Sequence, residues 1–523
     1  MKTALSKSRY TKFCQCPKAL WMSIYDPDKA TVDKGVEARF ADGNIVGDLA
    51  MGLFGDFVEV TSTTAENKLD LNAMIEKTGE LMAGNECNVI CEASFSYNCN
   101  GESNYCAVDI LRRTPGGWAI YEVKSTTSHI ADISLTNKEF VKKIKKYATD
   151  IAFQKWVLEK CGVNVTGTFL VTLNSDYIRN GELEIEKMFN IIDMGGLVEN
   201  EFVKVANTSK AAHNILKLQD EPCDKIGTQC HTPYQCAFWE YCTKQAGLDL
   251  ENNKATVFDL YSLSAKKKYE YFYKGMVSFE DIRNEKLADI RRMQVDCTLD
   301  NRIYINKDGI KEFLDKITYP LYFLDFESIQ PTLPQWDGTR PYMQLCFQYS
   351  LHYIEHEGGE LKHKEFLAPS DGSDPRRSLA EALCRDIPKN VCIMAYNDPF
   401  EKTRIKEMAS AFPDLAQHLL NIDNNIIDLL IPFRKGHYYT PAMGGSFSIK
   451  SVLPALFPND DELNYHNLNE NVQNGGQAMT IFPLIKDMPA DKAKEARQAL
   501  LDYCHLDTLA MVRVWEKLKE EIK

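Results

Sequence analysis

One segment of twenty residues constrains the fold of this 523-residue chain more than any other: CAVDILRRTPGGWAIYEVKS, residues 106–125. Two runs that favour β-strand flank the Pro-Gly-Gly turn at residues 115–117, a pattern that predicts a β-hairpin. If the first two turn residues form the loop, Asp109 faces Glu122; if the last two form it, Asp109 faces Lys124. In either register, strand alternation places these three side chains on one face of a sheet.

The chemistry of this face indicates a cation site. Two facing carboxylates repel each other unless one is protonated or a cation lies between them. Mg²⁺ or Mn²⁺ accepts oxygen ligands and would relieve the repulsion, polarise a phosphodiester and lower the pKa of a bound water. Lys124 would orient that water or neutralise charge at the phosphate. The alternative is an ordinary pair of an acid and a lysine on a hairpin surface, and the three residues alone favour neither.

Cysteines form a second pattern. Cys230, Cys236 and Cys242 recur every six residues in QCHTPYQCAFWEYC, and two more cysteines lie far upstream in FCQCPKALW. Sixteen cysteines are too sparse for a disulfide scaffold, and clustered thiols in a reducing compartment indicate a metal. Three close cysteines and one distant one would suit either a [4Fe–4S] cluster or Zn²⁺. Buried, unreactive thiols are the alternative.

A second set of acidic residues lies in the last two fifths of the chain. Asp325 and Glu327 are two residues apart in the apolar run LYFLDFES, so a strand there would present both on one face. Acidic groups in such a strand cost free energy unless they bind a cation or are exposed. Glu401 follows in AYNDPFEKTRIKEMA, and Tyr503 and Asp507 lie four apart on one face of a predicted helix.

Three zones are distinguishable along the chain. Residues 1–247 read as strands flanked by helices, residues 248–319 as helices, and residues 320–523 run from an apolar strand to a long final helix. The composition is that of a globular protein, with 44% apolar and 26% charged residues. The net charge of −13 is spread along the chain, which excludes a polybasic arm but not a basic groove. No apolar run reaches about 18 residues and the start MKTALSKSRY is polar, so we expect a cytoplasmic protein without a membrane segment.

The first two patterns carry a family resemblance. Asp109 and Glu122-Val-Lys124 resemble the core motif of the PD-(D/E)XK nucleases, and Gln154 in DIAFQKWVLE resembles the glutamine motif of RecB-type members. The cysteines are similar to those of the iron–sulfur RecB-type nucleases, which include the CRISPR adaptation exonuclease and the AddB nuclease domain. The resemblance implies that a [4Fe–4S] cluster, or Zn²⁺ in its place, is bound by Cys16, Cys230, Cys236 and Cys242.

Two details of this resemblance are open. Cys14 and Cys223 are spare cysteines, either of which would replace one of the four ligands. Relatives often carry a metal-binding histidine in a G-x3-H segment, where this sequence has glycine at position 47. Asp48 or Glu37 would then substitute for that histidine, or the metal would have fewer protein ligands.

The later acidic residues resemble the DEDD family of 3′→5′ exonucleases on the ribonuclease H-like fold. The D-x-E, N-x2-F-D and Y-x3-D motifs occur in the family's order, with Glu401 where the second motif has aspartate. In this resemblance two divalent ions, about 4 Å apart, would be held by Asp325, Glu327, Glu401 and Asp507. Tyr503 would position the attacking water, and Lys450 in GGSFSIKSVLPALFP would contact a nucleic-acid backbone or lie on a packed helix.

Together the resemblances imply an α/β chain with two nuclease domains. A PD-(D/E)XK restriction-endonuclease-like domain (1–247) would be joined by a helical connector (248–319) to a ribonuclease H-like domain (320–523). This fusion is similar to a bacterial family of predicted RecB-type nucleases of unknown function. The expected activity is metal-dependent DNA exonuclease action with two centres, in repair, recombination or defence against foreign DNA.

Two alternatives remain at this point. The glycine in place of histidine and the glutamate at position 401 favour a catalytically degenerate, nucleic-acid-binding scaffold within a larger nuclease, helicase or defence assembly. An RNA exonuclease is the other, because the 2′-OH is recognised by contacts that the sequence does not reveal. DNA is the expected partner, and no residue indicates a protein partner.

Overall fold

The chain folds into two compact units. The computed structural model describes residues 4–31, 34–84, 86–250 and 255–523, and only the backbone of residues 34–42. The first unit is Met1–Asp249 with Thr332–Tyr342, and the second is Leu250–Pro331 with Met343–Lys523. Both are mixed α/β, as the sequence predicts. The expected connector, residues 248–319, groups almost entirely with the second unit and holds a small apolar core around Val257 and Tyr271.

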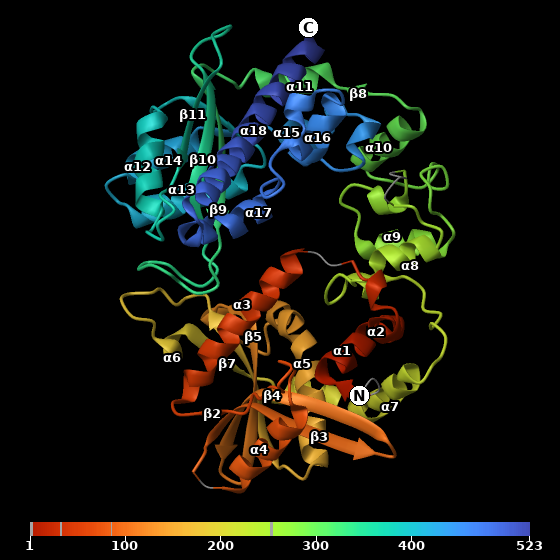
Figure 1. The fold of residues 1–523 in the computed structure, drawn as a ribbon. Helices are drawn as coiled ribbons and strands as arrows, with labels where there is room; N and C mark the ends of the chain where they lie inside the picture. Colours follow the sequence, from red (N-terminus) through yellow and green to blue (C-terminus); the bar gives the residue numbers. More distant parts are fainter. Residues whose placement is uncertain (1–3, 32–33, 85, 251–254) are drawn as a thin grey trace. The chain divides into compact units, whose positions relative to one another are not determined.

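A seven-stranded sheet forms the centre of the described part of the first unit (Figure 1). Its long middle strands β3, β4 and β5 are antiparallel, β6 joins β5 in parallel, and β7 joins β6 antiparallel. The strands are β1 (Leu5–Ser6), β2 (Val58–Glu59), β3 (Val89–Cys99), β4 (Glu102–Thr114), β5 (Gly117–Ser128), β6 (Val165–Asn174) and β7 (Phe189–Asp193). The helices are α1 (Lys7–Gln15), α2 (Pro17–Tyr25), α3 (Lys34–Met51), α4 (Leu71–Ala83), α5 (Lys138–Lys160), α6 (Ile185–Met188), α7 (Gly195–Leu216) and α8 (Trp239–Gln245).

The β4–β5 hairpin has the first of the two registers considered above. Thr114 pairs with Gly117, so residues 115 and 116 form the loop, and Gly116 takes a left-handed φ of 86° that suits glycine. The paired ladder ends at Ile110 and Tyr121. Asp109 and Glu122 therefore lie just beyond the last β4–β5 pair, although Glu122 still pairs with Leu170 of β6.

Helices cover both faces of this sheet, and the side-chain alternation breaks at one level. Along β4, Val108 and Leu111 belong to the core under α5 and α7, whereas Ile110 belongs to the core under α3. The alternation is therefore interrupted at Asp109. Strand β3 is interrupted at the opposite position, Glu92, which has a φ of 57°. An interruption of this kind re-aims side chains, here two acidic ones on neighbouring strands.

The second unit is built on a five-stranded sheet in the order β11-β10-β9-β12-β13 (Figure 1). Strands β11, β10 and β9 are antiparallel, and β12 and β13 continue parallel to β9. The strands are β9 (Leu321–Ile329), β10 (Leu345–Ile354), β11 (Lys362–Leu367), β12 (Cys392–Ala395) and β13 (Ile426–Asp428), with a separate pair β8 (Tyr304–Ile305) and β14 (Tyr438–Tyr439). The helices are α9 (Ala265–Tyr273), α10 (Asp289–Leu299), α11 (Lys307–Leu314), α12 (Arg376–Asp386), α13 (Pro399–Ala411), α14 (Ala416–Asn424), α15 (Ile431–Arg434), α16 (Ile449–Leu456), α17 (Gly475–Ile481) and α18 (Ala490–Ile522).

Alternate side chains of β9 contact the two different helical layers that cover the faces of this sheet. Its residues Tyr322, Leu324 and Phe326 pack into the core formed with α12, α13 and α14. Phe323 points the other way and meets Trp515 of α18, with ring centroids 5.6 Å apart. Because side chains alternate along a strand, the two acidic residues of D-x-E lie on the α18 face.

Helix α18, with 33 residues, has the length to cross a bilayer. Its sequence, however, carries charged residues from its first turn to its last. In the part of the chain that the structure describes, no helix combines the length and the apolar character that a membrane span requires.

Candidate metal centres

Three of the predicted carboxylates of the second unit converge. Asp325 and Glu327 from β9 and Asp507 from α18 each offer an oxygen, and these oxygens lie within 4.8 Å of one another. Burial, followed by repulsion from Asp507, raises the pKa of Glu327 to about 8 and that of Asp325 well above its usual range. Burial also raises the pKa of Asp507. Carboxylates arranged in this way bind either protons or a hard divalent cation.

Glu401, the fourth predicted carboxylate, lies outside this trio. It is buried in the first turn of α13, where burial raises its pKa to about 8. Its charge contributes to the raised pKa of Asp325 and Glu327, so it acts on the same centre. Within the described residues, its Oε2 atom is buried without a hydrogen-bond partner. A buried carboxylate oxygen of this kind is costly unless a cation satisfies it, so the donor set fits a divalent ion.

Tyr503 lies beside the trio together with two residues that the sequence did not assign to it. Lys450 Nζ donates to Tyr503 Oη over 3.0 Å, and Tyr465 Oη donates to Asp507 Oδ1 over 2.5 Å. The charge of Lys450 lowers the pKa of Glu327 and partly offsets the repulsion. The sequence indicated Lys450 only as a candidate backbone contact, and Tyr465 carried no recognisable signal.

The residues predicted for the first centre also come together. Gln154 Nε2 of α5 donates to Glu122 Oε2 over 2.6 Å, and Lys124 Nζ donates to Glu122 Oε1 over 2.6 Å. Lys124 also pairs with Asp150 at 3.1 Å. Asp109 Oδ2 accepts a backbone N–H of β5 over 2.7 Å. Glu122 is fully buried, and although burial opposes its charge, the two neighbouring lysines hold its pKa at about 2.

The ammonium group of Lys7 lies where a metal ion was expected. Its Nζ atom is 3.0 Å from Glu122 Oε1 and 3.5 Å from Asp109 Oδ1. Strand β1 pairs in parallel with β4, and this pairing brings the first residue of α1 to the two carboxylates. Burial lowers the pKa of Lys7, but Asp109 and Glu122 outweigh burial and raise it overall. Lys7 and Lys124 thus balance the two carboxylates.

Glu92 is a further acidic residue at this centre, missed by the sequence analysis. It is half-buried, and burial, followed by repulsion from Asp109, raises its pKa to about 7. Its left-handed φ is uncommon outside glycine and marks a site of backbone strain. Of the two acidic residues considered as histidine substitutes, Asp48 is exposed on α3, and the side chain of Glu37 lies outside the described residues.

The four predicted cysteine ligands surround one small cavity. Cys16, the N-cap of α2, lines it together with Cys230, Cys236 and Cys242. Neither of the spare cysteines, both exposed, is among its lining residues. Burial raises the pKa of Cys16 and Cys242 to about 11, so without a metal both are protonated and poorly nucleophilic.

Replacing Lys7 by Ala is expected to destabilise the metal-free protein by about 3 kcal/mol, because two largely buried carboxylates lose a shared counter-ion. Mn²⁺ is then expected to raise Tm more in Lys7→Ala than in wild type, since the ion takes the vacated position. Thermal unfolding with and without Mn²⁺ measures both effects. Lys142→Ala, an exposed position on α5, is the control; a Tm and Mn²⁺ response in Lys7→Ala equal to those of this control would contradict the role of Lys7.

Comparison with known proteins identifies similarity over parts of the chain. A family model described as a domain of unknown function (DUF2779) matches residues 322–448, which include Asp325, Glu327 and Glu401. A protein of Mycoplasma pneumoniae, described as an uncharacterized MG366 homolog, is 23% identical over 242 residues, or 42% of this chain. The match spans 36% of that relative's length. The crystal structure of SSO0001 aligns with 46% of this chain and 86% of its own, at 14% identity and a TM-score of 0.24.

Proposed function

We propose that this protein is a metal-dependent nuclease that hydrolyses DNA phosphodiesters from strand ends, with its principal centre in the second unit. The observation that carries the proposal is the convergence of Asp325, Glu327 and Asp507, buried and in mutual repulsion. Mg²⁺ or Mn²⁺ bound there would stabilise the charge that develops on the scissile phosphate and the leaving oxygen. Glu401 completes the acidic set from α13.

Within this proposal, Tyr503 orients the attacking water. Its oxygen accepts a hydrogen bond from Lys450, and its hydroxyl also interacts with Asp507, so the group is held at the centre from two sides. Burial and the charge of Asp507 raise the pKa of Tyr503, so the phenol stays protonated and acts as an orienting group. Tyr465 holds Asp507 in place through its hydroxyl.

The proposal extends to the folds of the two units. The mixed sheet β11-β10-β9-β12-β13, with carboxylates on its central strand and on the last helix, supports a ribonuclease H-like domain. The β4–β5 hairpin with Glu122 bonded to both Gln154 and Lys124 supports a PD-(D/E)XK domain. A cytoplasmic location also belongs to the proposal, since all sixteen cysteines are free thiols.

A non-catalytic role is the second candidate for the first centre, and Lys7 is the observation that favours it. Lys7 and Lys124 lie against Asp109 and Glu122, so part of the negative charge of this centre is already compensated without a metal. It would then bind nucleic acid and present it, while cleavage occurs in the second unit. For cleavage at the first centre, Lys7 must leave when the metal enters.

The cysteine cavity is proposed to hold a [4Fe–4S] cluster. In a tetrahedral zinc tetrathiolate the sulfurs are about 3.8 Å apart, as Zn–S bonds of about 2.3 Å dictate. Among the described residues, the groups of three or more ligands that lie within 4.8 Å of one another contain no cysteine. No three of the four sulfurs therefore lie within 4.8 Å of one another, which supports the larger cluster over zinc.

Cys236→Ser is therefore expected to remove the broad visible absorption of a brown, anaerobically purified protein, because the cluster loses one of its four ligands. Cys223→Ser, an exposed cysteine outside the cavity, is expected to retain the colour and the iron content. Absorption spectra and iron and zinc analysis of the three proteins measure the effect. One equivalent of zinc without iron in the wild type would contradict the cluster.

An end-labelling assay tests the proposed function. Single-stranded DNA, duplex DNA and RNA, each labelled at either end, are incubated with Mg²⁺ or Mn²⁺ and with wild type, Lys124→Ala or Asp325→Ala. Loss of cleavage in Asp325→Ala alone supports one centre, in the second unit. Loss of opposite polarities in the two variants supports two exonucleases. If the wild type cleaves RNA but not DNA, RNA is the substrate instead of DNA. If the wild type binds nucleic acid but cleaves none, the proposal that the protein is an enzyme is overturned.

A further inference from the structure

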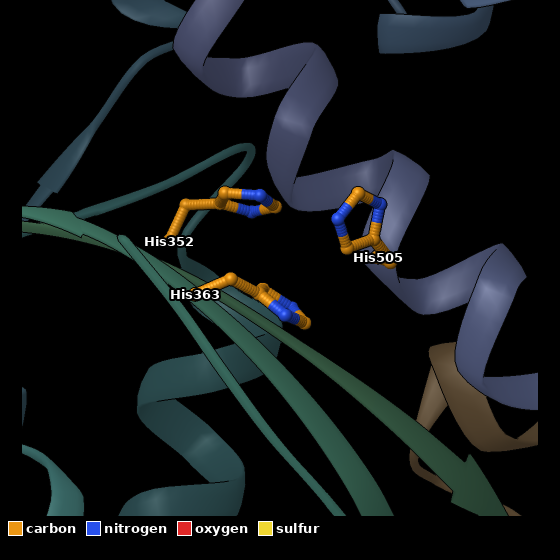
Figure 2. Close-up of side chains that lie close together, drawn as sticks. All are labelled: His352, His363 and His505. Carbon is orange, nitrogen blue, oxygen red and sulfur yellow. The ribbon is translucent and has the colours of Figure 1, made fainter. Parts of the chain in front are cut away.

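Three histidines gather on the β10–β11 edge of the second unit's sheet, beneath α18. His352 on β10 and His363 on β11 are paired across the strands, and His505 comes from α18. Figure 2 shows the three rings entering the same space between the strands and the helix. Their ring centroids are 4.5 to 4.7 Å apart, and each ring offers one nitrogen within 4.8 Å of the other two.

A hydrogen-bond chain engages one ring nitrogen of His352 and one of His363. Thr508 Oγ1 lies 3.1 Å from the carbonyl oxygen of His505, to which its hydroxyl donates. Thr508 Oγ1 also forms hydrogen bonds with His352 Nδ1 at 2.8 Å and with Ser350 Oγ at 2.7 Å. Ser350 Oγ in turn forms a hydrogen bond with His363 Nε2 at 2.9 Å. Within the described residues, His352 Nε2 and His363 Nδ1 carry no hydrogen bond, so these two nitrogens are open to a metal ion.

The remaining features also suit metal ligands. In the described part of the chain, the ring of His505 has no hydrogen-bond partner. Burial and the neighbouring imidazoles lower the pKa of His352 to about 3 and that of His363 to about 4, so both rings are neutral at pH 7. Histidines that bind metals characteristically hold the other ring nitrogen in a hydrogen bond, as Ser350 and Thr508 do here.

We propose that His352, His363 and His505 form a transition-metal site of the zinc type, separate from the carboxylate centre. Three neutral imidazoles suit Zn²⁺, Fe²⁺, Ni²⁺ or Cu²⁺, whereas Mg²⁺ and Mn²⁺ prefer oxygen ligands. Three protein ligands leave a fourth tetrahedral position for water or another small ligand. His363 and His505 are only half-buried, so the proposed site lies near the surface of the second unit.

The two sites lie side by side on one face of the sheet. Ser350 of β10 pairs with Asp325 of β9, and Thr508 follows Asp507 on α18. The two hydroxyls that orient the histidines are therefore next to the carboxylates. The ligand types differ, so the chain would hold a hard cation and a borderline one in adjacent positions.

Zinc content tests the proposal. Wild type, His363→Gln, His505→Gln and the control His356→Gln, an exposed histidine between β10 and β11, are dialysed against Zn²⁺ and analysed for bound metal. The cysteines and carboxylates are unchanged in all four proteins, so their contribution cancels. We expect His363→Gln and His505→Gln to bind one equivalent of zinc less than the wild type and the control. Equal contents in all four would overturn the site.

A second measurement does not depend on the variants. Crystals of wild type soaked in Zn²⁺ are measured at the zinc absorption edge. An anomalous peak at bonding distance from the three imidazoles supports the site even if both variants fail to fold. If the three rings are well ordered and no peak lies between them, the site is overturned. Neither measurement uses DNA, so failure of the proposed nuclease activity and failure of this site are distinguishable.

Discussion

Replacing Asp507 by Asn is expected to reduce the rate of DNA cleavage by about 10³-fold, equivalent to about 4 kcal/mol of transition-state stabilisation. Asparagine keeps the shape of the side chain and an oxygen for the Tyr465 hydroxyl, but it removes a charge from the buried trio. The loss should fall on kcat, because the missing interaction strengthens as charge develops on the phosphate. Initial rates of cleavage of end-labelled DNA at saturating Mg²⁺ or Mn²⁺ measure it.

Asp502→Asn is the matched control, because this exposed aspartate lies on the same helix and accepts a hydrogen bond from Gln498 outside the buried trio. It should cleave at the wild-type rate. Asp507→Asn should unfold at or above the wild-type Tm without metal, since the substitution removes repulsion among buried carboxylates. An Asp507→Asn protein that keeps a wild-type rate would exclude this centre from catalysis.

The metal-free protein is expected to become less stable as the pH rises from about 5 to 8. In the folded state the pKa of both Glu327 and Glu401 is about 8, against 4.5 for an ordinary glutamate. The folded state therefore binds more protons, and stability falls as the pH rises through this window. At about 1.4 kcal/mol per pKa unit, each group accounts for a few kcal/mol. Glu92, with a pKa of about 7, acts in the same direction.

Thermal unfolding at pH 5, 6, 7 and 8 with a chelator, and again with Mg²⁺, measures this effect. Mg²⁺ should raise Tm more at pH 8 than at pH 5, because it replaces the protons that the carboxylates lose. Glu327→Gln should flatten the metal-free profile. Glu122 does not affect the stability profile between pH 5 and 8. Its pKa is about 2, so its contribution to the pH dependence of stability falls below pH 4.5. A Tm that is constant from pH 5 to 8 without metal would contradict the raised pKa values.

Short-range spacing predicted several positions well. The hairpin of β4 and β5 followed from its turn, which left two registers open until the structure selected the first, and the common face of Asp325 and Glu327 followed from strand alternation. The four-residue spacing of Tyr503 and Asp507 placed both at the same centre, as the helical repeat requires. In each case the partners lie within one element or one hairpin, where geometry is fixed by few torsion angles.

The missed residues depend on long-range packing. Lys7 reaches Asp109 because β1 pairs with β4, about a hundred residues away, and nothing in the local text MKTALSKSRY indicates this pairing. An interruption of side-chain alternation in β3 turns Glu92 toward the centre, and no glycine or proline in the sequence indicates that interruption. The histidine cluster joins a hairpin to a helix some 140 residues later, so only the folded chain reveals it.

Helix α18 has little tolerance for changes in length. Within six positions it carries Tyr503, His505, Asp507 and Thr508, and it fixes its own rotation by packing Trp515 against Phe323 of β9. An α-helix turns by about 100° per residue, so a single inserted residue between positions 503 and 515 would swing one part of this face away from the sheet. Insertions and deletions between these positions should therefore be excluded during evolution, and variation in length should be confined to the last turn, beyond the buried Leu518.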